Sequence, residues 1–195
     1  SILSSVPDLV LIEPCTESEV EMALDYSVNE TSSSIYLRLV SIPYDVPFQL
    51  PVSYQLEYGK GVSLTEGDDA VMFSYGPVML TQAVKAAELL KKEHGLGLCV
   101  VNLPWLNHVD ADWLRSSVKG VKYIFTLDDH FVKGGQGEML GCSLSEQNEA
   151  TDFRLCRIGI NEIPACGQND DVLSEHGMDA KALTDRVCMA VEGRA

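Results

Sequence analysis

Three adjacent polar residues, Asp128, Asp129 and His130, have side chains that could carry out acid–base chemistry. An imidazole beside carboxylates titrates near neutral pH and can exchange a proton with a bound molecule. The triplet also follows an apolar run, residues 121–127, and a polar cluster at a strand end can cap the next helix or meet a partner subunit. We favour this second interpretation, in which Asp129 and His130 have a structural or interface role. No nucleophile elbow or Ser–His–Asp order is present.

The segment Gly134-Gly135-Gln136-Gly137 precedes an expected helix, and such a turn can hold a phosphate at the start of the helix. It lacks the full dinucleotide-binding pattern and the acidic residue expected further along the chain. We therefore interpret Gly134, Gly135 and Gly137 as structural, in a tight turn where backbones pack closely.

Residues 16–19 (Thr-Glu-Ser-Glu) fit a capping box, in which the Thr16 hydroxyl and the Glu19 carboxylate satisfy the first free amides of a helix. The helix is expected to run to about Val28. Its inner face is expected to contain Val20, Ala23, Leu24 and Ser27.

Two short strands, at residues 9–12 and 35–40, flank this helix. One strand–helix–strand crossover is too small to bury itself. The chain opens close to the first strand without an initiator Met, which suggests a cut protein, an engineered protein, or a disordered part left out of the numbering. Residues 42–61 carry Pro43, Pro47 and Pro51 without helical period, and we interpret them as an inter-domain linker along the surface.

From residue 62 onward, strand and helix patterns alternate. Strands are expected at 70–75, 98–103, 121–127 and 153–160, and helices at 78–93, 110–118, 134–147 and 179–191. This alternation predicts a three-layer α/β/α domain over residues 62–195, with a mostly parallel sheet. The helix at 78–93 is the most regular, with one apolar face formed by Leu80, Ala83, Val84, Ala87 and Leu90.

Composition excludes several classes of function. The chain has 29 acidic and 14 basic residues and a formal net charge of −15, so its surface repels nucleic acid and anionic membranes. Its six cysteines form no CxxC pair, which argues against a zinc site, and we expect reduced thiols in a cytoplasmic protein. No apolar run is long enough to span a bilayer.

Several motifs of the larger domain occur in a fixed order. Residues 64–69 (Leu-Thr-Glu-Gly-Asp-Asp) precede a strand that ends in Tyr75-Gly76 and then an alanine-rich helix. Residues 126–130 (Thr-Leu-Asp-Asp-His) are followed by the glycine turn at 134–137. Near the end of the chain, residues 173–179 (Leu-Ser-Glu-His-Gly-Met-Asp) precede the last helix.

Two further motifs lie upstream, at residues 13–19 (Glu-Pro-Cys, then Glu19) and 36–39 (Tyr-Leu-Arg-Leu). Together the five motifs resemble the C-terminal part of the transketolase family of thiamine-diphosphate-dependent enzymes, and the resemblance covers nearly the whole chain. It implies that residues 1–41 are the tail of a pyrimidine-binding domain and that residues 62–195 are the transketolase C-terminal domain.

The resemblance also implies a function: transfer of two-carbon ketol units between sugar phosphates by the parent protein. The cofactor would be thiamine diphosphate with Mg²⁺ or Ca²⁺, whose thiazolium carbon becomes a carbanion. In the family, the catalytic glutamate and the cofactor and metal ligands lie upstream of the point where this chain begins. We therefore expect no catalytic, cofactor-binding or metal-binding residue here, no cofactor bound to this segment alone, and an inactive isolated segment. We also expect a homodimer formed through the C-terminal domain, with the upstream region in the same protein or in a split subunit.

Two positions could contact substrate, Thr16 and Arg38. The Pro-x-Asp of the family reads Pro14-Cys15-Thr16 here, and its phosphate-binding Arg falls at Ser41. Arg38 lies three positions earlier, and odd spacing in a strand places the two side chains on opposite faces. These departures keep open a relative with different substrates.

Other functions therefore stay open. A deoxyxylulose-phosphate synthase and the beta subunit of a 2-oxoacid dehydrogenase are enzymes of the same superfamily. A non-catalytic assembly module that acts only by dimerisation is a different class, and a flavodoxin-like small-molecule binder rests on analogy of fold alone.

Overall fold

The computed structural model describes residues 2–41, 44–146 and 152–193, which form two sheets. The larger has five strands in the order β3-β5-β4-β6-β7. β4 (Ala70–Ser74), β5 (Leu98–Asn102), β6 (Tyr123–Phe131) and β7 (Arg154–Ile160) are parallel to their neighbours, and only the two-residue β3 (Val62–Ser63) is antiparallel. β4 lies at the centre, and all five of its residues are buried, as expected for a strand covered on both faces.

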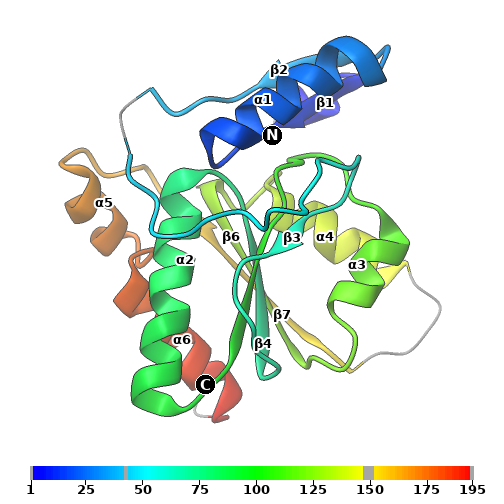
Figure 1. Cartoon of the computed structure of the whole chain (residues 1–195). Coiled ribbons are helices and arrows are strands. Elements are labelled where there is room, and N and C mark those ends of the chain that lie inside the picture. The colour runs from blue at the N-terminus through cyan, green and yellow to red at the C-terminus, as the bar shows by residue number, and fades with distance from the viewer. Residues whose placement is uncertain (1, 42–43, 147–151, 194–195) are drawn as a thin grey trace.

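Helices cover both faces of this sheet (Figure 1). α2 (Pro77–Leu89) and α6 (Ala180–Val191) pack against each other on one face, and α3 (Ala111–Ser117) and α4 (Gln136–Ser145) lie on the other. The expected helix at 78–93 corresponds to α2 and the wider turn that follows it, Leu90–His94. All five apolar residues predicted for its inner face are buried: Leu80, Ala83, Val84, Ala87 and Leu90. The predicted three-layer α/β/α architecture with a mostly parallel sheet is confirmed.

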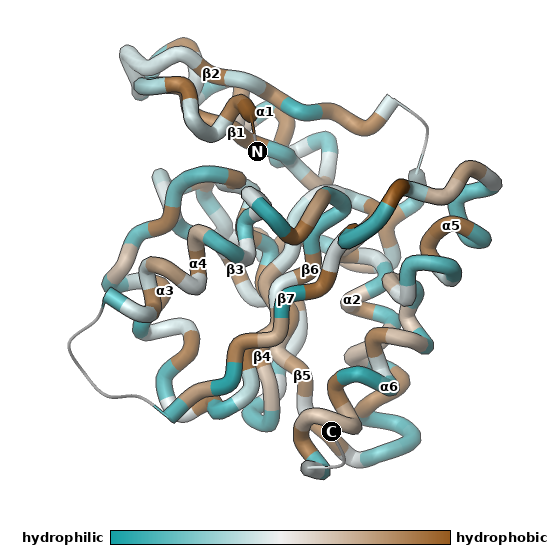
Figure 2. Tube along the Cα trace, turned by 180° about the vertical axis from the view of Figure 1, so that it is seen from behind, coloured by the Kyte–Doolittle hydropathy of each residue, from teal (hydrophilic) through white to brown (hydrophobic). Residues whose placement is uncertain are grey.

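A smaller unit precedes this domain. β1 (Leu9–Ile12) and β2 (Ser34–Leu37) are parallel, and α1 (Glu17–Asp25), which continues as a wider turn over Tyr26–Glu30, connects them. Figure 1 shows this unit lying over the end of the large sheet at which β4 and β6 finish. Figure 2 shows the same placement from behind, with hydrophobic stretches inside the small unit.

β1 is bonded on both of its edges. Beside its pairing with β2, Glu13 N donates to Pro104 O and Leu106 N donates to Leu11 O, both at 2.9 Å. The Trp105 side chain between these contacts is fully buried and shares one hydrophobic cluster with residues of β1 and α1. The small unit and the domain therefore share one hydrophobic core, to which β1 and Trp105 both contribute.

The structure corrects several expectations. β6 runs on to Phe131 instead of ending at 127, because β7 pairs with it again at Phe131 after a register shift. Leu24 is 50% exposed, whereas Glu19, which was expected only to cap the helix, is fully buried. The segment 44–61 does not lie wholly on the surface, since Tyr54 and Leu56 are buried. A short helix that was not expected, α5, spans Asn169–Glu175.

All six cysteines are free thiols, and two of them, Cys15 and Cys188, are buried. In the part of the chain that the structure describes, no helix has the length and apolar character needed to cross a membrane.

Candidate functional site

Arg38 connects the small unit to the large sheet. It follows β2 and donates two hydrogen bonds of 2.7 Å to the two carboxylate oxygens of Asp129, in β6. Its Nη1 also lies 3.0 Å from Glu13 Oε2, just beyond β1. Two parallel N–H···O bonds between guanidinium and carboxylate are among the strongest hydrogen bonds in proteins. Arg38 thus interacts with two acidic side chains, Glu13 of the small unit and Asp129 of the large sheet.

Glu13 is the most deeply buried member of this cluster, with 2% of its surface exposed. Burial and, after it, the charge of Asp129 raise its pKa to about 8, and Arg38 opposes the shift. The contact with Arg38 has the length of an ion pair, but Glu13 Oε2 makes no aligned hydrogen bond. For Arg38, burial acts to lower the pKa, but Asp129 and Glu13 outweigh it, so the pKa lies above its ordinary value. Burial, together with the neighbouring Asp129, thus favours a protonated Glu13 at neutral pH.

Asp128, which precedes Asp129 in the chain, contacts the start of α4 and does not pair with Arg38. Its carboxylate is 1% exposed and accepts hydrogen bonds from Gln136 N (2.9 Å), Gly137 N (3.2 Å) and Tyr75 Oη (3.0 Å). Burial raises its pKa, and these hydrogen bonds oppose the shift. Asp128 therefore satisfies free amides at the start of α4, where a negative charge is favourable.

The glycine turn is closely packed. A Cβ atom at Gly135 would lie 3.0 Å from the Asp128 carboxylate, and one at Gly137 would lie 2.2 Å from Thr126 Oγ1. Gly134 has a positive φ of 71°, and its amide donates to Glu138 Oε2 at 2.6 Å. The amides of this turn thus have protein partners, and a side chain at either packed position would collide with β6.

His130 is not part of the Arg38 cluster. Its Nδ1 lies 3.0 Å from Phe131 O, and its ring contacts the ring of Phe131, which is 45% exposed. The three neighbouring residues therefore have different contacts. Asp128 accepts hydrogen bonds from amides at the start of α4, and Asp129 accepts them from Arg38. His130 is half-buried and lies beside the exposed ring of Phe131.

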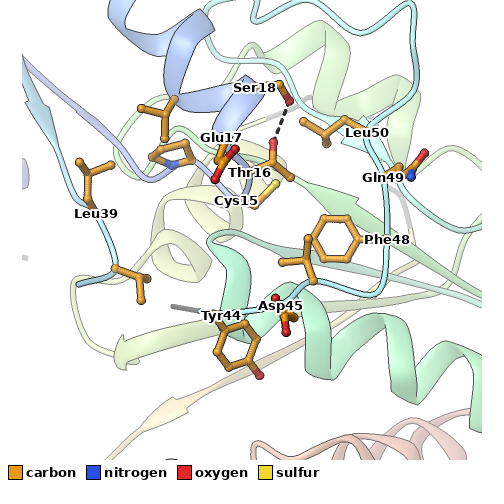
Figure 3. A pocket seen from close by; sticks show the side chains of 14 residues that line it. Cys15, Thr16, Glu17, Ser18, Leu39, Tyr44, Asp45, Phe48, Gln49 and Leu50 are labelled. Carbon is orange, nitrogen blue, oxygen red and sulfur yellow. Dashed lines mark hydrogen bonds between the residues drawn. The ribbon is translucent and has the colours of Figure 1, made fainter. Parts of the chain in front are cut away.

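Thr16 lines a pocket of about 710 Å³ (Figure 3). One wall is formed by the loop before α1 and its first turn, residues 14–18 and 20, and the other by residues 39–40, 44–46 and 48–50. The Thr16 hydroxyl accepts from Glu19 N at 3.2 Å and lies 3.0 Å from Ser18 Oγ. Half of the predicted capping box is thereby confirmed. The Glu19 carboxylate bonds Cys15 N instead of the Thr16 amide.

Glu19 holds this wall in place. Its Oε2 accepts from Cys15 N at 2.7 Å, and its Oε1 accepts from Tyr54 Oη at 2.8 Å and from Asn102 Nδ2 at 2.7 Å. Burial raises its pKa, and the hydrogen bonds from Cys15, Tyr54 and Asn102 oppose the shift. Glu19 therefore joins the pocket loop, the 44–61 segment and the end of β5. The capping box and the motif at residues 13–19 were the sequence signals for it, and neither predicted its burial.

The residues that line the pocket can position a ligand, but they include no activated nucleophile. Burial raises the pKa of the Cys15 thiol, and the adjacent Glu19 raises it further, so the thiol stays protonated. Among the described residues no three His, Cys, Asp or Glu side chains are grouped to hold a metal ion.

These features define a class: a three-layer α/β domain that carries a partial α/β unit over the ends of its strands, with a pocket beside that unit. Residues 59–183 match the family model described as "Transketolase, C-terminal domain", and the chain belongs to this family. The resemblance inferred from the sequence motifs is confirmed.

Curated relatives are longer than this chain. It is 30% identical over 184 residues to the 1-deoxy-D-xylulose-5-phosphate synthase of Synechocystis, covering 94% of this chain and 27% of the relative. The synthase of Trichormus variabilis is 27% identical over 190 residues, covering 96% and 29%. A transketolase family protein of Sinorhizobium fredii, described as putative and uncharacterized, is 30% identical over 146 residues, covering 74% and 41%. The chain spans less than a third of the length of these synthases.

Solved structures share the fold. A structure titled "Split gene transketolase, inactive beta4 tetramer" has a TM-score of 0.85 at 23% identity, with 98% of this chain and 60% of that chain covered. A mutant transketolase from Pichia stipitis has a TM-score of 0.72 at 17% identity, with 97% and 26% covered. Both likenesses extend through the small unit as well as the larger domain.

Proposed function

We propose that this chain is the C-terminal section of a thiamine-diphosphate-dependent transferase of two-carbon ketol units. The observation that carries the proposal is the pocket at Thr16, which lies beside an incomplete α/β unit. In the described residues β2 pairs with β1 alone, so one of its edges is open to a further strand. The pocket and the open edge support a site that is completed by chain outside these residues.

In this proposal the cofactor, with Mg²⁺ or Ca²⁺, is bound by residues outside this chain. Residues 1–41 form the tail of the pyrimidine-binding domain, 42–61 the linker and 62–195 the C-terminal domain. The chain contributes Thr16 to the substrate-facing wall, and Arg38 acts indirectly by fixing that wall to the domain. Asp129, His130 and the glycine turn have structural and interface roles.

The partner in this proposal is the upstream region, either in the same protein or as a split subunit, and the C-terminal domain associates as a homodimer in the cytoplasm. The neighbour titled as a split-gene tetramer supports a divided protein of this kind. We expect the isolated chain to be inactive.

A synthase of deoxyxylulose phosphate is the second candidate, because synthases of that name match at least 94% of this chain. The third candidate is a non-catalytic assembly module. The sequence of the upstream coding region distinguishes this module from both enzymes. An upstream glutamate and an aromatic pocket favour an enzyme, and their absence favours the module.

Isothermal titration of thiamine diphosphate with Mg²⁺ tests the proposal. The chain is titrated alone and then mixed with the upstream portion of its gene product. We expect binding in the mixture only, followed by transfer from a ketose donor. Turnover of a 2-oxoacid donor instead would select the synthase, and absence of binding in both samples would reject the enzyme.

A further inference from the structure

The segment between β7 and α5, residues 161–168, is held by few contacts. Seven of its eight residues are exposed, Ile163 to 91%, and only Ala165 is half-buried. Among the described residues, a single hydrogen bond joins residues 161–167 to the rest of the protein: Ala165 N donates to His176 Nε2 at 3.0 Å. A segment without buried side chains opens easily, so its position depends on this one bond.

The acceptor side of this bond is fixed by α5. His176 follows the last residue of that helix, and its amide donates to Val172 O at 3.1 Å. Just beyond it, Met178 N donates to Leu173 O at 2.8 Å, and the side chains of both residues are buried. Loss of the bond would therefore release the segment and leave the end of the helix in place.

The bond requires a neutral imidazole that carries its proton on Nδ1. A backbone N–H can only donate, so the ring nitrogen that meets Ala165 N must be an unprotonated acceptor. Imidazole is the side chain that changes its charge between pH 5 and pH 8. A protonated ring has a donor at each nitrogen, so one N–H would face another and the bond would be lost.

Charged groups of both signs line a hollow of about 320 Å³ beside the ring. Glu162 comes from the segment, Glu175 from α5 and Arg186 from α6. Asp179, at the start of α6, is bonded to an amide of its own helix. The two glutamates therefore offer a protonated His176 carboxylate partners in place of the Ala165 amide.

We propose that His176 and Ala165 form an acid-sensitive latch. The latch holds residues 161–168 in place while the imidazole is neutral and releases them when the ring is protonated, which opens the hollow on the side of the segment. It does not depend on the proposed function, because neither of its residues lines the pocket at Thr16.

The test follows the Ala165 amide and the His176 ring nitrogens of the chain by ¹H–¹⁵N NMR between about pH 8 and pH 5. At the upper pH the ring is expected to carry its proton on Nδ1. On acidification the Ala165 amide signal should move with the same midpoint as the ring. Its protection against hydrogen exchange, corrected for the intrinsic effect of pH on exchange, should fall by at least about tenfold.

Three variants complete the test. His176→Gln keeps an acceptor oxygen that does not titrate, so Ala165 should stay protected at both ends of the pH range. His176→Ala removes the acceptor and should leave this amide unprotected throughout. His94→Gln is the matched control, since it removes an exposed histidine after α2, and it should behave as the wild-type protein does.

Three outcomes would overturn the proposal. The first is a proton on Nε2 of His176 at the upper pH. The second is an Ala165 amide that keeps its position and protection while the ring titrates. The third is an amide equally protected in His176→Ala and in the wild-type protein, because other contacts would then hold the segment.

Discussion

Arg38 and Asp129, 91 positions apart in the chain, are joined by two hydrogen bonds of 2.7 Å each. One residue follows β2 of the small unit, and the other belongs to β6 of the large sheet. Glu13 approaches the same guanidinium from the end of β1. This cluster therefore couples the orientation of the pocket wall to the domain beneath it.

Removal of the Arg38 charge should destabilise the protein. Arg38→Gln leaves the partly buried Asp129 carboxylate without its cation, and removing one partner of such a pair is costly. Because Arg38 and Asp129 are partly solvated, we expect a loss of about 1–3 kcal/mol in the free energy of unfolding. Urea denaturation measures it. Lys60→Gln is the matched control, since it breaks an exposed pair with Glu57, and it should cause no measurable change.

Glu13 should make stability depend on pH. Its pKa rises from 4.5 to about 8 in the folded protein, so the folded state binds more protons between these values. Its contribution is therefore complete below about pH 4.5, falls as the pH rises, and is lost above about pH 8. Glu13→Gln imitates the protonated acid and removes this dependence. Relative to wild type, the variant should gain on the order of 2–4 kcal/mol between pH 5 and pH 9 in urea denaturation. A difference between the two proteins that does not vary with pH would contradict the assignment.

Individual helices and strands could be predicted because their signals lie within a few neighbouring residues. The apolar positions of α2 recur at helical spacing, and Gly76-Pro77 marks where that helix begins. The partners of Arg38 and Glu19 could not be predicted, because the sequence gives no sign of which residues meet across 91, 35 or 83 positions. Glu19 was misjudged for a physical reason: an acidic residue in the first turn of a helix normally faces water. Its burial is tolerable because Tyr54 and Asn102, from distant segments, donate to it together with the nearby Cys15 amide.

Gly137 should not tolerate a side chain. A Cβ atom there would lie 2.2 Å from Thr126 Oγ1 in the buried strand β6, so either α4 or the strand must shift. We expect Gly137→Ala to cost about 1–3 kcal/mol despite the better helix propensity of alanine. Gly141→Ala in the same helix is the control, because it would meet only the flexible end of Leu155. Thermal unfolding of both variants decides the point, and equal midpoints would show that the turn has no need of close packing.

The Glu19 carboxylate should be more important for the pocket than the Thr16 hydroxyl, which accepts from the Glu19 amide. Thr16→Ala removes one capping acceptor and should cost about 1 kcal/mol. Glu19→Gln keeps the shape but replaces one acceptor oxygen by an NH₂ group. That group must face Cys15 N on one side, or Tyr54 Oη and Asn102 Nδ2 on the other. A buried donor facing donors should cost about 2–4 kcal/mol, and it should loosen the wall on which Thr16 lies.

Glu17→Gln provides the control for this prediction, because Glu17 is in the same turn of α1 but is exposed. It should change the free energy of unfolding by less than about 0.5 kcal/mol. Urea denaturation gives the stability of the three variants, and hydrogen exchange of the Cys15 amide reports the pocket wall directly. Faster exchange at Cys15 in Glu19→Gln but not in Glu17→Gln is the expected result. Equal protection in both variants would mean that the loop is held by packing, and that the buried carboxylate is not what fixes it.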